Sequence, residues 1–416
     1  MSIILDPKES AITRGIKTVG VGKKGSKALG EDLASEILND LKADKISSAA
    51  KGAFFAGLLA KGLEPYEKAL LEAVAPGALE DSRKLVEVIA GDASAFARWV
   101  CVHLLENHTL DKKTAYDLGR FLFSDEPGNG ARGLVASILR VRYETDDEYE
   151  GLLQALLDTV DPTFNNSVLQ GEPLVQLAEP FDGVDHSYMI TPLVARYIQS
   201  LGYRALHMVG KNSGPKWEMN LWDIASSLKE GSIQNAADLA LSKPSFGWFC
   251  YQNNISQAIE RWHLIRKQTI KRPFMSTIER FLNPFKADII IASAFHPPYG
   301  QKMLTLAQRA GFKGIVIVRN GLEGTIAFPL LRPVKLLLSG LGKDGQYHDH
   351  EMTLDTVGGV DSEQMVEHPR AKDNGVLIEN FLKEGSSGNV HFDLRLKATC
   401  EGLEKALQWL NAHASC

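Results

Sequence analysis

The sequence predicts an α/β protein in which a helical N-terminal region precedes a domain built on a mostly parallel sheet. Residues 30–156 repeat apolar side chains at the spacing of amphipathic helices, as in EDLASEILNDL and AAKGAFFAGLLAKG. From about residue 172, short apolar runs rich in branched residues alternate with helical stretches. That alternation is typical of β-α-β units, whose parallel strands are buried on both faces.

The composition is that of an ordinary globular protein. The 416 residues are 44% hydrophobic and 23% charged, and the formal net charge is −5. Cys101, Cys250, Cys400 and Cys416 are far apart and form no CxxC pair, which argues against a zinc site and fits a reducing compartment. No apolar run approaches the roughly 18 residues that span a bilayer, and the N-terminus lacks the pattern of a secretion signal. We therefore expect a cytoplasmic protein without a membrane partner.

The helical region contains two similar segments. AGLLAKGLEPYEKALLEA (residues 56–73) and ASILRVRYETDDEYEGLLQA (136–155) share a small residue, an apolar pair, a basic residue, an acid, Tyr-Glu and Leu-Leu in that order. The pattern predicts a duplicated helical unit with small insertions, and two unrelated amphipathic helices are the alternative. We accordingly expect a helical extension over 1–109 that partly repeats the next unit, a helical domain over 110–165 and an α/β domain over 166–416.

The α/β region predicts a series of buried strands. They are PLVQLA (173–178), YRALHMV (203–209), FGWFCY (246–251), DIIIAS (288–293), GIVIVR (314–319) and VKLLLS (334–339). TPLVARYIQSLG, MNLWDIASSLKEG and HPPYGQKMLTLAQRAG are predicted helices between them, and LKATCEGLEKALQWLNA is a closing helix. Ligands of such sheets bind beyond the carboxyl ends of the strands, so the loops that follow the strands are searched first.

The loop after the first predicted strand, EPFDGVDHSYMITP (179–192), contains one glycine among acids. Gly183 lets a backbone N–H approach a phosphate, but Glu179, Asp182 and Asp185 would repel that phosphate unless Mg²⁺ intervened. The next loop, GKNSGPKWEMN (210–220), combines glycines with Lys211 and Lys216 and lacks the GK[ST] ending of a Walker motif. Solvated turn residues are the alternative interpretation of both loops.

Basic residues concentrate in RKQTIKRPFMSTIERFLNPF, residues 266–285. Pro273 directly follows Arg272 and disfavours helix there, so Arg266 is expected late in one helix and Arg272 in the turn after it. Guanidinium groups at such an elbow suit a carboxylate or a phosphate. GVGKKGSK (20–27) mixes glycine with lysine and predicts either a phosphate contact or a solvated lead-in to the helices.

The segment IRKQTIKRPFMSTIERFLNP resembles the signature of the anthranilate phosphoribosyltransferases, glycosyltransferase family 3. In that signature a second Arg follows the first by six residues and an Asn-Pro follows eleven further on, here Arg266, Arg272 and Asn283-Pro284. HPPYGQKMLTLAQRAGFKGIVIVRNGLEG resembles the family's His-Pro helix, strand and acidic turn, and residues 110–156 resemble its N-terminal helical region. The resemblance covers most of residues 110–340.

The resemblance implies a fold of the nucleoside phosphorylase/phosphoribosyltransferase type and a homodimer. It also implies a transferase of tryptophan biosynthesis that moves phosphoribose from phosphoribosyl pyrophosphate to a small aromatic or carboxylate acceptor such as anthranilate. Catalysis would rest on positioning and charge stabilisation, and no catalytic side chain is assigned. Glu323 is what remains of the acidic turn that holds Mg²⁺ in the family. The positions that match substrate-binding motifs are Arg266, Arg272, Asp182, Gly183, Gly210, Lys211 and Asn212.

The loop sequences are closer to a divergent TrpD-like branch whose pyrophosphate loops are degraded. EPFDGVD keeps only Asp182-Gly183 of the family's Gly-rich loop, and GIKTVGVGKKGSKALGEDLA (15–34) and GLEGTIAFP (321–329) resemble that branch. The branch implies single-stranded nucleic acid as the partner of a basic dimer groove. Phosphate contacts would then come from Lys23, Lys24, Lys211, Lys216, Arg266, Lys267, Lys271 and Arg272. The family resemblance favours a transferase, with a nucleic-acid-binding homologue as the alternative, and a retired enzyme that acts as a scaffold also stays open.

Overall fold

The computed structural model describes residues 6, 8–22, 25–164, 171–212, 214, 216–240, 243–295 and 297–414. Its contacts divide the chain into two compact units. The helical unit comprises residues 1–158 and 258–278, and the sheet unit comprises residues 159–257 and 279–416. The domain boundaries expected at 109 and 165 remain a prediction. The contacts give a different kind of division, in which residues 258–278 belong with the N-terminal helices.

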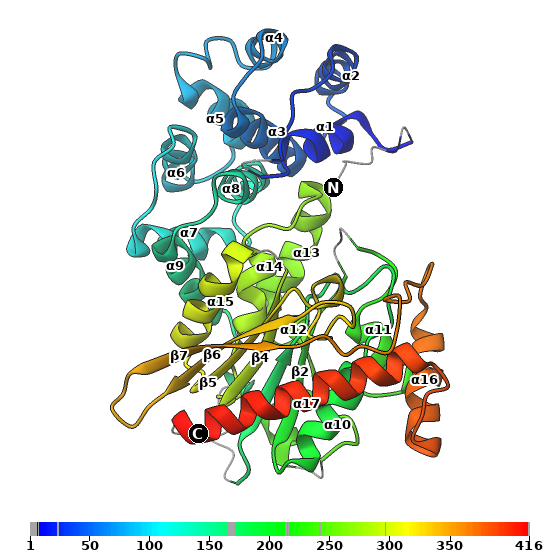
Figure 1. The fold of residues 1–416 in the computed structure, drawn as a ribbon. Helices are drawn as coiled ribbons and strands as arrows, with labels where there is room; N and C mark the ends of the chain where they lie inside the picture. Colours follow the sequence, from blue (N-terminus) through cyan, green and yellow to red (C-terminus); the bar gives the residue numbers. More distant parts are fainter. Residues whose placement is uncertain are drawn as a thin grey trace. The chain divides into compact units, whose positions relative to one another are not determined.

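Helices make up the helical unit throughout its described residues (Figure 1). They are α1 (Ala11–Val19), α2 (Glu31–Lys42), α3 (Ser48–Lys61), α4 (Pro65–Val74), α5 (Ser82–Ala90), α6 (Ala95–Leu105), α7 (Lys112–Leu122), α8 (Asn129–Arg142), α9 (Asp146–Leu157), α13 (Gln257–Thr269) and α14 (Met275–Ile278). The Ser47 hydroxyl caps α3 by accepting from the Ala50 N–H. Helix α13 ends three residues before Arg272, which lies in the connection to α14, as the sequence predicts for the elbow.

The sheet unit alternates strands and helices. Its elements are η1 (Pro162–Phe164), β1 (Leu174–Ala178), α10 (Thr191–Ser200), β2 (Arg204–Val209), α11 (Leu221–Ser227), η2 (Ala236–Ala240), β3 (Trp248–Tyr251), α12 (Gln252–Ile255), η3 (Glu279–Phe281), β4 (Ile289–Ala294), α15 (Pro297–Arg309), β5 (Gly314–Arg319), η4 (Leu322–Gly324), β6 (Val334–Leu341), β7 (Tyr347–Leu354), α16 (Ala371–Glu384) and α17 (Val390–His413). The predicted α/β class with a helical N-terminal region is therefore confirmed.

Across the described residues the sheet has seven strands in the order β3-β2-β1-β4-β5-β6-β7. Strands β1 to β5 are parallel, and β6 and β7 join the β5 edge antiparallel. The chain builds outward from β1 to β2 and β3 and then returns to β4 on the other side of β1. The strand order thus reverses at the β1–β4 pair, where ligands of open α/β sheets bind beyond the carboxyl ends.

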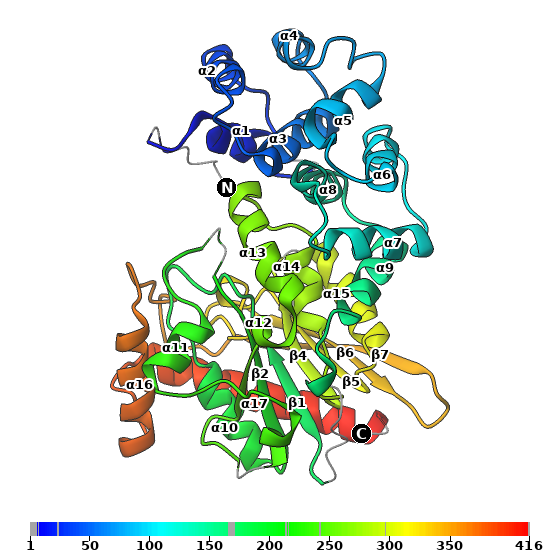
Figure 2. The ribbon, with the colours of Figure 1, turned by 180° about the vertical axis from the view of Figure 1, so that it is seen from behind.

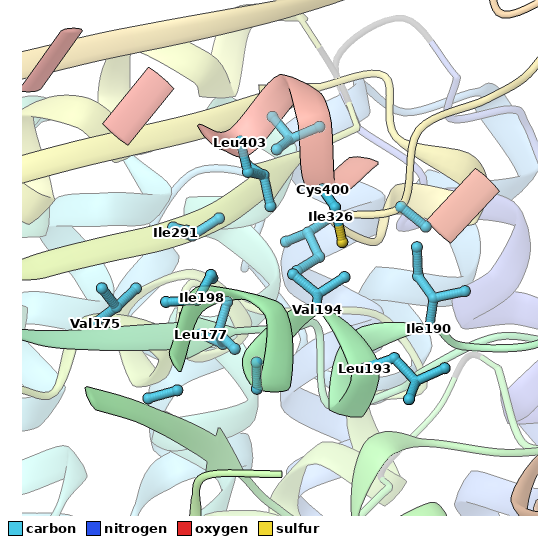
Figure 3. Packing of buried hydrophobic residues seen from close by; sticks show 14 of the residues in the cluster. Val175, Leu177, Ile190, Leu193, Val194, Ile198, Ile291, Ile326, Cys400 and Leu403 are labelled. Atoms are coloured by element: carbon cyan, nitrogen blue, oxygen red, sulfur yellow. The ribbon is translucent and has the colours of Figure 1, made fainter. Parts of the chain in front are cut away.

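One face of the sheet is covered by α10 and α17, and α17 runs across it in both ribbon views (Figures 1 and 2). Figure 3 shows Val194 and Ile198 of α10 packed near Leu177 of β1, with Ile291 of β4 and Leu403 of α17 beside them. Burial of such side chains contributes about 1.5–3 kcal/mol each, which fixes the strand ends that carry the candidate site. Among the described residues no helix combines the length and apolar character needed to cross a membrane.

Candidate functional site

Glu323 occupies the centre of three loops that follow β1, β2 and β5. Its Oε1 accepts from the backbone N of Asp185 at 3.0 Å, and its Oε2 accepts from the backbone N of His186 at 3.0 Å and from the Ser187 hydroxyl at 2.6 Å. Two successive backbone N–H groups aimed at one anion form the kind of nest that binds phosphate in other proteins. Here the chain's own carboxylate fills that nest.

Two further backbone N–H groups of the loop after β1 are also used within the protein. The Gly183 N–H donates to the Pro180 carbonyl at 3.0 Å, and the Val184 N–H donates to the Met219 carbonyl at 2.8 Å. Lys216 Nζ donates to the Gly183 carbonyl at 3.0 Å and to the Glu323 carbonyl. Lys216, which the sequence suggested as a phosphate ligand, therefore connects the loops after β1, β2 and β5 by hydrogen bonds.

Two predicted site glycines have a packing role. Gly183 has φ +67°, and a Cβ built on it would lie 2.0 Å from the Met219 carbonyl oxygen. A Cβ on Gly210 would lie 2.6 Å from the Phe181 ring. Glycine is required at Gly183 by both backbone conformation and contact, and at Gly210 by the aromatic ring above it.

The other predicted residues of these loops lie close to them. Asp182 is 4% exposed, and its carbonyl accepts from Asn212 Nδ2 at 3.4 Å. Asn212 Oδ1 accepts from the Gly214 N–H at 2.9 Å, which stabilises the turn after β2. Lys211 is exposed at the end of β2. The structure thus brings the predicted sheet-unit residues to one edge of the sheet, as the strand-end argument requires.

Glu179, directly after β1, is buried at the strand-order reversal. Its Oε1 accepts from the Thr191 hydroxyl at 2.6 Å and its Oε2 from the Ile326 N–H at 3.0 Å. Burial raises the pKa of Glu179 to about 7, against the opposing influence of these two donors and of Arg280 and Lys216. A carboxyl whose pKa lies near 7 can both accept and release a proton at neutral pH, and proton-transfer sites often contain such a group.

The residues present do not fit a Mg²⁺ ion. Mg²⁺ requires near-octahedral oxygen ligands, usually with one or two free carboxylates. Glu323 accepts three hydrogen bonds and lies 3.9 Å from Lys216 Nζ, and Glu179 is buried and held by two donors. Among the described residues no group of three or more His, Cys, Asp or Glu is arranged to hold a metal. The predicted role of Glu323 as a Mg²⁺ ligand therefore has no support in this geometry.

A recess lies at the carboxyl ends of β1 and β2 and is lined by Glu179, Phe181, Gly210, Asn220 and Trp222.

The predicted arginines lie in the helical unit. Arg266, in the last turn of α13, is 6% exposed and donates to the Ser276 hydroxyl at 3.0 Å across the elbow. Arg272 is partly buried, and its carbonyl accepts from Arg140 of α8 at 2.5 Å. Arg266 therefore helps to hold the elbow in shape, whereas Arg272 belongs to a larger basic group.

Arg140 connects the two basic motifs that the sequence places about 250 residues apart. Its guanidinium donates to the carbonyls of Gly20 at 3.2 Å and Val21 at 3.4 Å, as well as to that of Arg272. The glycine–lysine loop after α1 and the elbow after α13 are thus held side by side. Lys23 and Lys24 of that loop lie outside the described residues.

Lys271 sits in the middle of this basic group. Burial and the nearby charges of Arg140 and Lys17 together lower the pKa of Lys271 to about 8, against the opposing influence of Glu9. Glu9 in turn pairs with Lys17. We call Lys17, Arg140, Lys271 and Arg272 the basic cluster, whose positive charges exceed the nearby negative ones.

Sequence reasoning found Lys271 and Arg272 but missed Arg140 and Lys17. Arg140 lies between the buried apolar residues Leu139 and Val141 of α8, and an arginine between apolar residues was the available signal. The exposed Lys267 lies one turn before the elbow. Tyr143, 39% exposed with φ +69°, places its hydroxyl beside Gly22 of the loop. The cluster therefore combines cations with an aromatic ring.

Sequence comparison gives little information about identity. No protein-family model matches the chain. A protein of Aquifex aeolicus (strain VF5), described as uncharacterized, is 24% identical over 235 residues, which cover 56% of this chain and 69% of that protein.

Comparison of structures is more informative. Anthranilate phosphoribosyltransferase (TrpD) from Thermus thermophilus matches with a TM-score of 0.51 and 17% identity, over 75% of this chain and 97% of that one. The Saccharomyces cerevisiae enzyme, solved in complex with PRPP and Mg, matches with a TM-score of 0.56 and 13% identity, over 77% of this chain and 94% of that one. At these identities the likeness concerns the fold, so this chain has the helical-plus-α/β fold of the anthranilate phosphoribosyltransferases.

Proposed function

We propose that the chain binds single-stranded nucleic acid through the basic cluster of its helical unit and does not transfer phosphoribose. The supporting observation is the bridge made by Arg140, which joins the loop at residues 20–22 to the elbow at Lys271 and Arg272. Closely spaced cations attract a phosphate backbone, and an exposed ring such as Tyr143 offers a surface on which a base stacks.

The backbone nest that Glu323 fills in the sheet unit supports the proposal that the chain does not transfer phosphoribose. A phosphoribosyltransferase needs backbone donors free for the diphosphate, and here Glu323 accepts from Asp185, His186 and Ser187. The carboxylate competes with any phosphate for these donors and repels it as well.

The test is fluorescence anisotropy of a labelled single-stranded oligonucleotide with the full chain at low salt. The double variant Lys271→Ala/Arg272→Ala should bind at least about tenfold more weakly, because two phosphate contacts are lost. Lys68→Ala removes an exposed charge from α4 of the same unit and serves as the control, which should bind like the parent chain. Equal affinities of the double variant and the parent chain would remove the basis of the proposal.

The second candidate is a pentosyltransferase that moves phosphoribose to a small acid, and the fold favours it. If the nest accepts diphosphate once it is vacated, Glu323→Ala should bind pyrophosphate more tightly than the parent chain. Calorimetry with phosphoribosyl pyrophosphate and Mg²⁺ separates the two candidates. Heat of binding to the parent chain, with no oligonucleotide binding, would favour the transferase.

A further inference from the structure

The two halves of the helical unit contain the same helices at a constant offset. Helices α2, α3 and α4 begin at Glu31, Ser48 and Pro65, and α7, α8 and α9 begin 81 residues later. Helices α3 and α8 have equal lengths of 14 residues. The correspondence extends from residues 29–74 to residues 110–155, which we call the first and second repeats.

Each repeat is closed by one buried glutamate with the same partners. Glu67 Oε1 accepts from the Leu29 N–H at 2.9 Å, and Glu148 Oε1 accepts from the Leu110 N–H at 3.0 Å. A base six residues earlier pairs with each glutamate at 2.6 Å, namely Lys61 in the first repeat and Arg142 in the second.

The second oxygens match as well. Glu67 Oε2 accepts from the Glu64 N–H and Glu148 Oε2 from the Thr145 N–H, both at 2.8 Å. These contacts pair Glu67 with Glu148, whereas the Tyr-Glu similarity of the sequences pairs it with Glu150. The structural register therefore contains no insertion between these helices.

The contacts between α3 and α8 are reciprocal. A Cβ on Gly52 would lie 2.1 Å from the Gly130 carbonyl oxygen, and a Cβ on Gly133 would lie 2.0 Å from the Ala49 carbonyl oxygen. Gly52 corresponds to Gly133, and Ala49 corresponds to Gly130, at the same offset of 81 residues. The position of Gly52 and Gly133 in one repeat thus contacts the position of Ala49 and Gly130 in the other repeat, and this holds in both directions. Such reciprocal contacts are characteristic of a two-fold interface. Repeats stacked by translation would instead present different faces to each other.

We propose that the two repeats pack within one chain as two copies of the second repeat would pack across the interface of a two-fold dimer. The first repeat takes the place of the partner subunit. The chain then contains a fused dimer interface and is a monomer in solution, in contrast to the homodimer that the sequence resemblance implies. Most of α8, from Gly130 to Leu139, is buried in the described structure. Without the first repeat, Gly133 and the Gly130 carbonyl would be open to an identical face, while Ile89 of α5 would still pack against the α-carbon of Gly130.

The test is the mass of the full chain by sedimentation and light scattering at micromolar concentrations. The parent chain should be a single species of 45.7 kDa. A dimer of the parent chain would overturn the proposal.

A pair of variants makes the test specific to this face. Gly52→Leu pushes the first repeat away from α8, yet leaves intact the Gly130 and Gly133 positions with which two α8 helices would meet. Its mass should double through α8 pairing between chains. Gly133→Leu blocks the contact within the chain and the contact between chains alike, so this variant should stay at the parent mass. If the two variants behave alike, the α8 face has no self-complementarity and the proposal is wrong.

Discussion

Glu179 makes the stability of the sheet unit depend on pH. Its pKa is raised by burial from 4.5 to about 7, so the folded chain holds a proton that the unfolded chain has already released. Its contribution to stability is fully present below about pH 4.5 and is lost as the pH rises to 7, by about 3 kcal/mol in total.

Glu179→Gln should abolish this loss. The amide imitates the protonated carboxyl, because its oxygen can accept from the Ile326 N–H while its NH₂ donates to the Thr191 hydroxyl. Thermal unfolding should give similar Tm values for variant and parent near pH 4.5 and a higher Tm for the variant above about pH 7. Glu379→Gln, on the exposed part of α16, is the control. Parallel Tm profiles for all three chains would contradict a buried, neutral Glu179.

If the chain binds nucleic acid as proposed, Lys271 should make the affinity depend on pH in a different range. Burial, Arg140 and Lys17 lower its pKa to about 8, so it loses its charge as the pH rises through that value. Affinity of the parent chain for an oligonucleotide should therefore fall between about pH 7 and pH 9. Lys271→Arg retains its charge over that range, since guanidinium deprotonates only far above it, and its affinity should stay constant. The same fall in both chains would show that Lys271 does not contact the ligand.

At the scale of the elements, most of the fold follows from sequence pattern. The six predicted strands begin within two residues of β1 to β6, because continuous apolar runs between turns mark buried strands. Strand β7 was missed since YHDHEMTL is polar and largely exposed, and pairs only with β6 at the sheet edge in the described structure. Helices α1 and α16 were also missed.

The candidate site was only partly predictable. The argument from strand ends correctly gathers Asp182, Gly183 and Asn212 at one edge of the sheet. It does not indicate that Glu323, 138 residues after Asp185, would satisfy the loop's N–H groups, because that contact depends on tertiary packing alone. The Arg140 bridge across 132 residues to Arg272 was hidden for the same reason.

The glutamates that close the two repeats support a prediction about elements. Glu148→Ala would leave the buried Leu110 N–H, the partly buried Thr145 N–H and the Arg142 guanidinium without their acceptor, at a cost of about 3 kcal/mol or more in the free energy of unfolding. Glu67→Ala should cost a similar amount. Glu150→Ala is the matched control in α9, since its pair with Lys112 is at the surface and contributes less than about 1 kcal/mol. Denaturant unfolding measures the free energy of unfolding of the three variants. A larger decrease for Glu150→Ala than for Glu148→Ala would contradict the register of the repeats.

At the scale of the whole molecule, the net charge of −5 restricts how the chain can bind a polyanion. The net negative charge opposes the approach of nucleic acid, so among the described residues we expect the attraction to come from the basic cluster and its neighbour Lys267. Binding through so few cations releases few counterions, and the slope of log affinity against log salt should be about −3 to −4.

For a single strand, each phosphate contact that is removed lowers the magnitude of this slope by about 0.7, so Lys271→Ala/Arg272→Ala should lower it by about 1.4. Lys68→Ala should leave the slope unchanged, although it makes the net charge of the chain more negative by one, because its lysine does not touch the ligand. Anisotropy titrations over a series of salt concentrations measure all three slopes. A slope that falls equally in the double variant and in Lys68→Ala would mean that overall charge controls binding. A decrease confined to the double variant would place the phosphates at the loop and elbow that Arg140 joins.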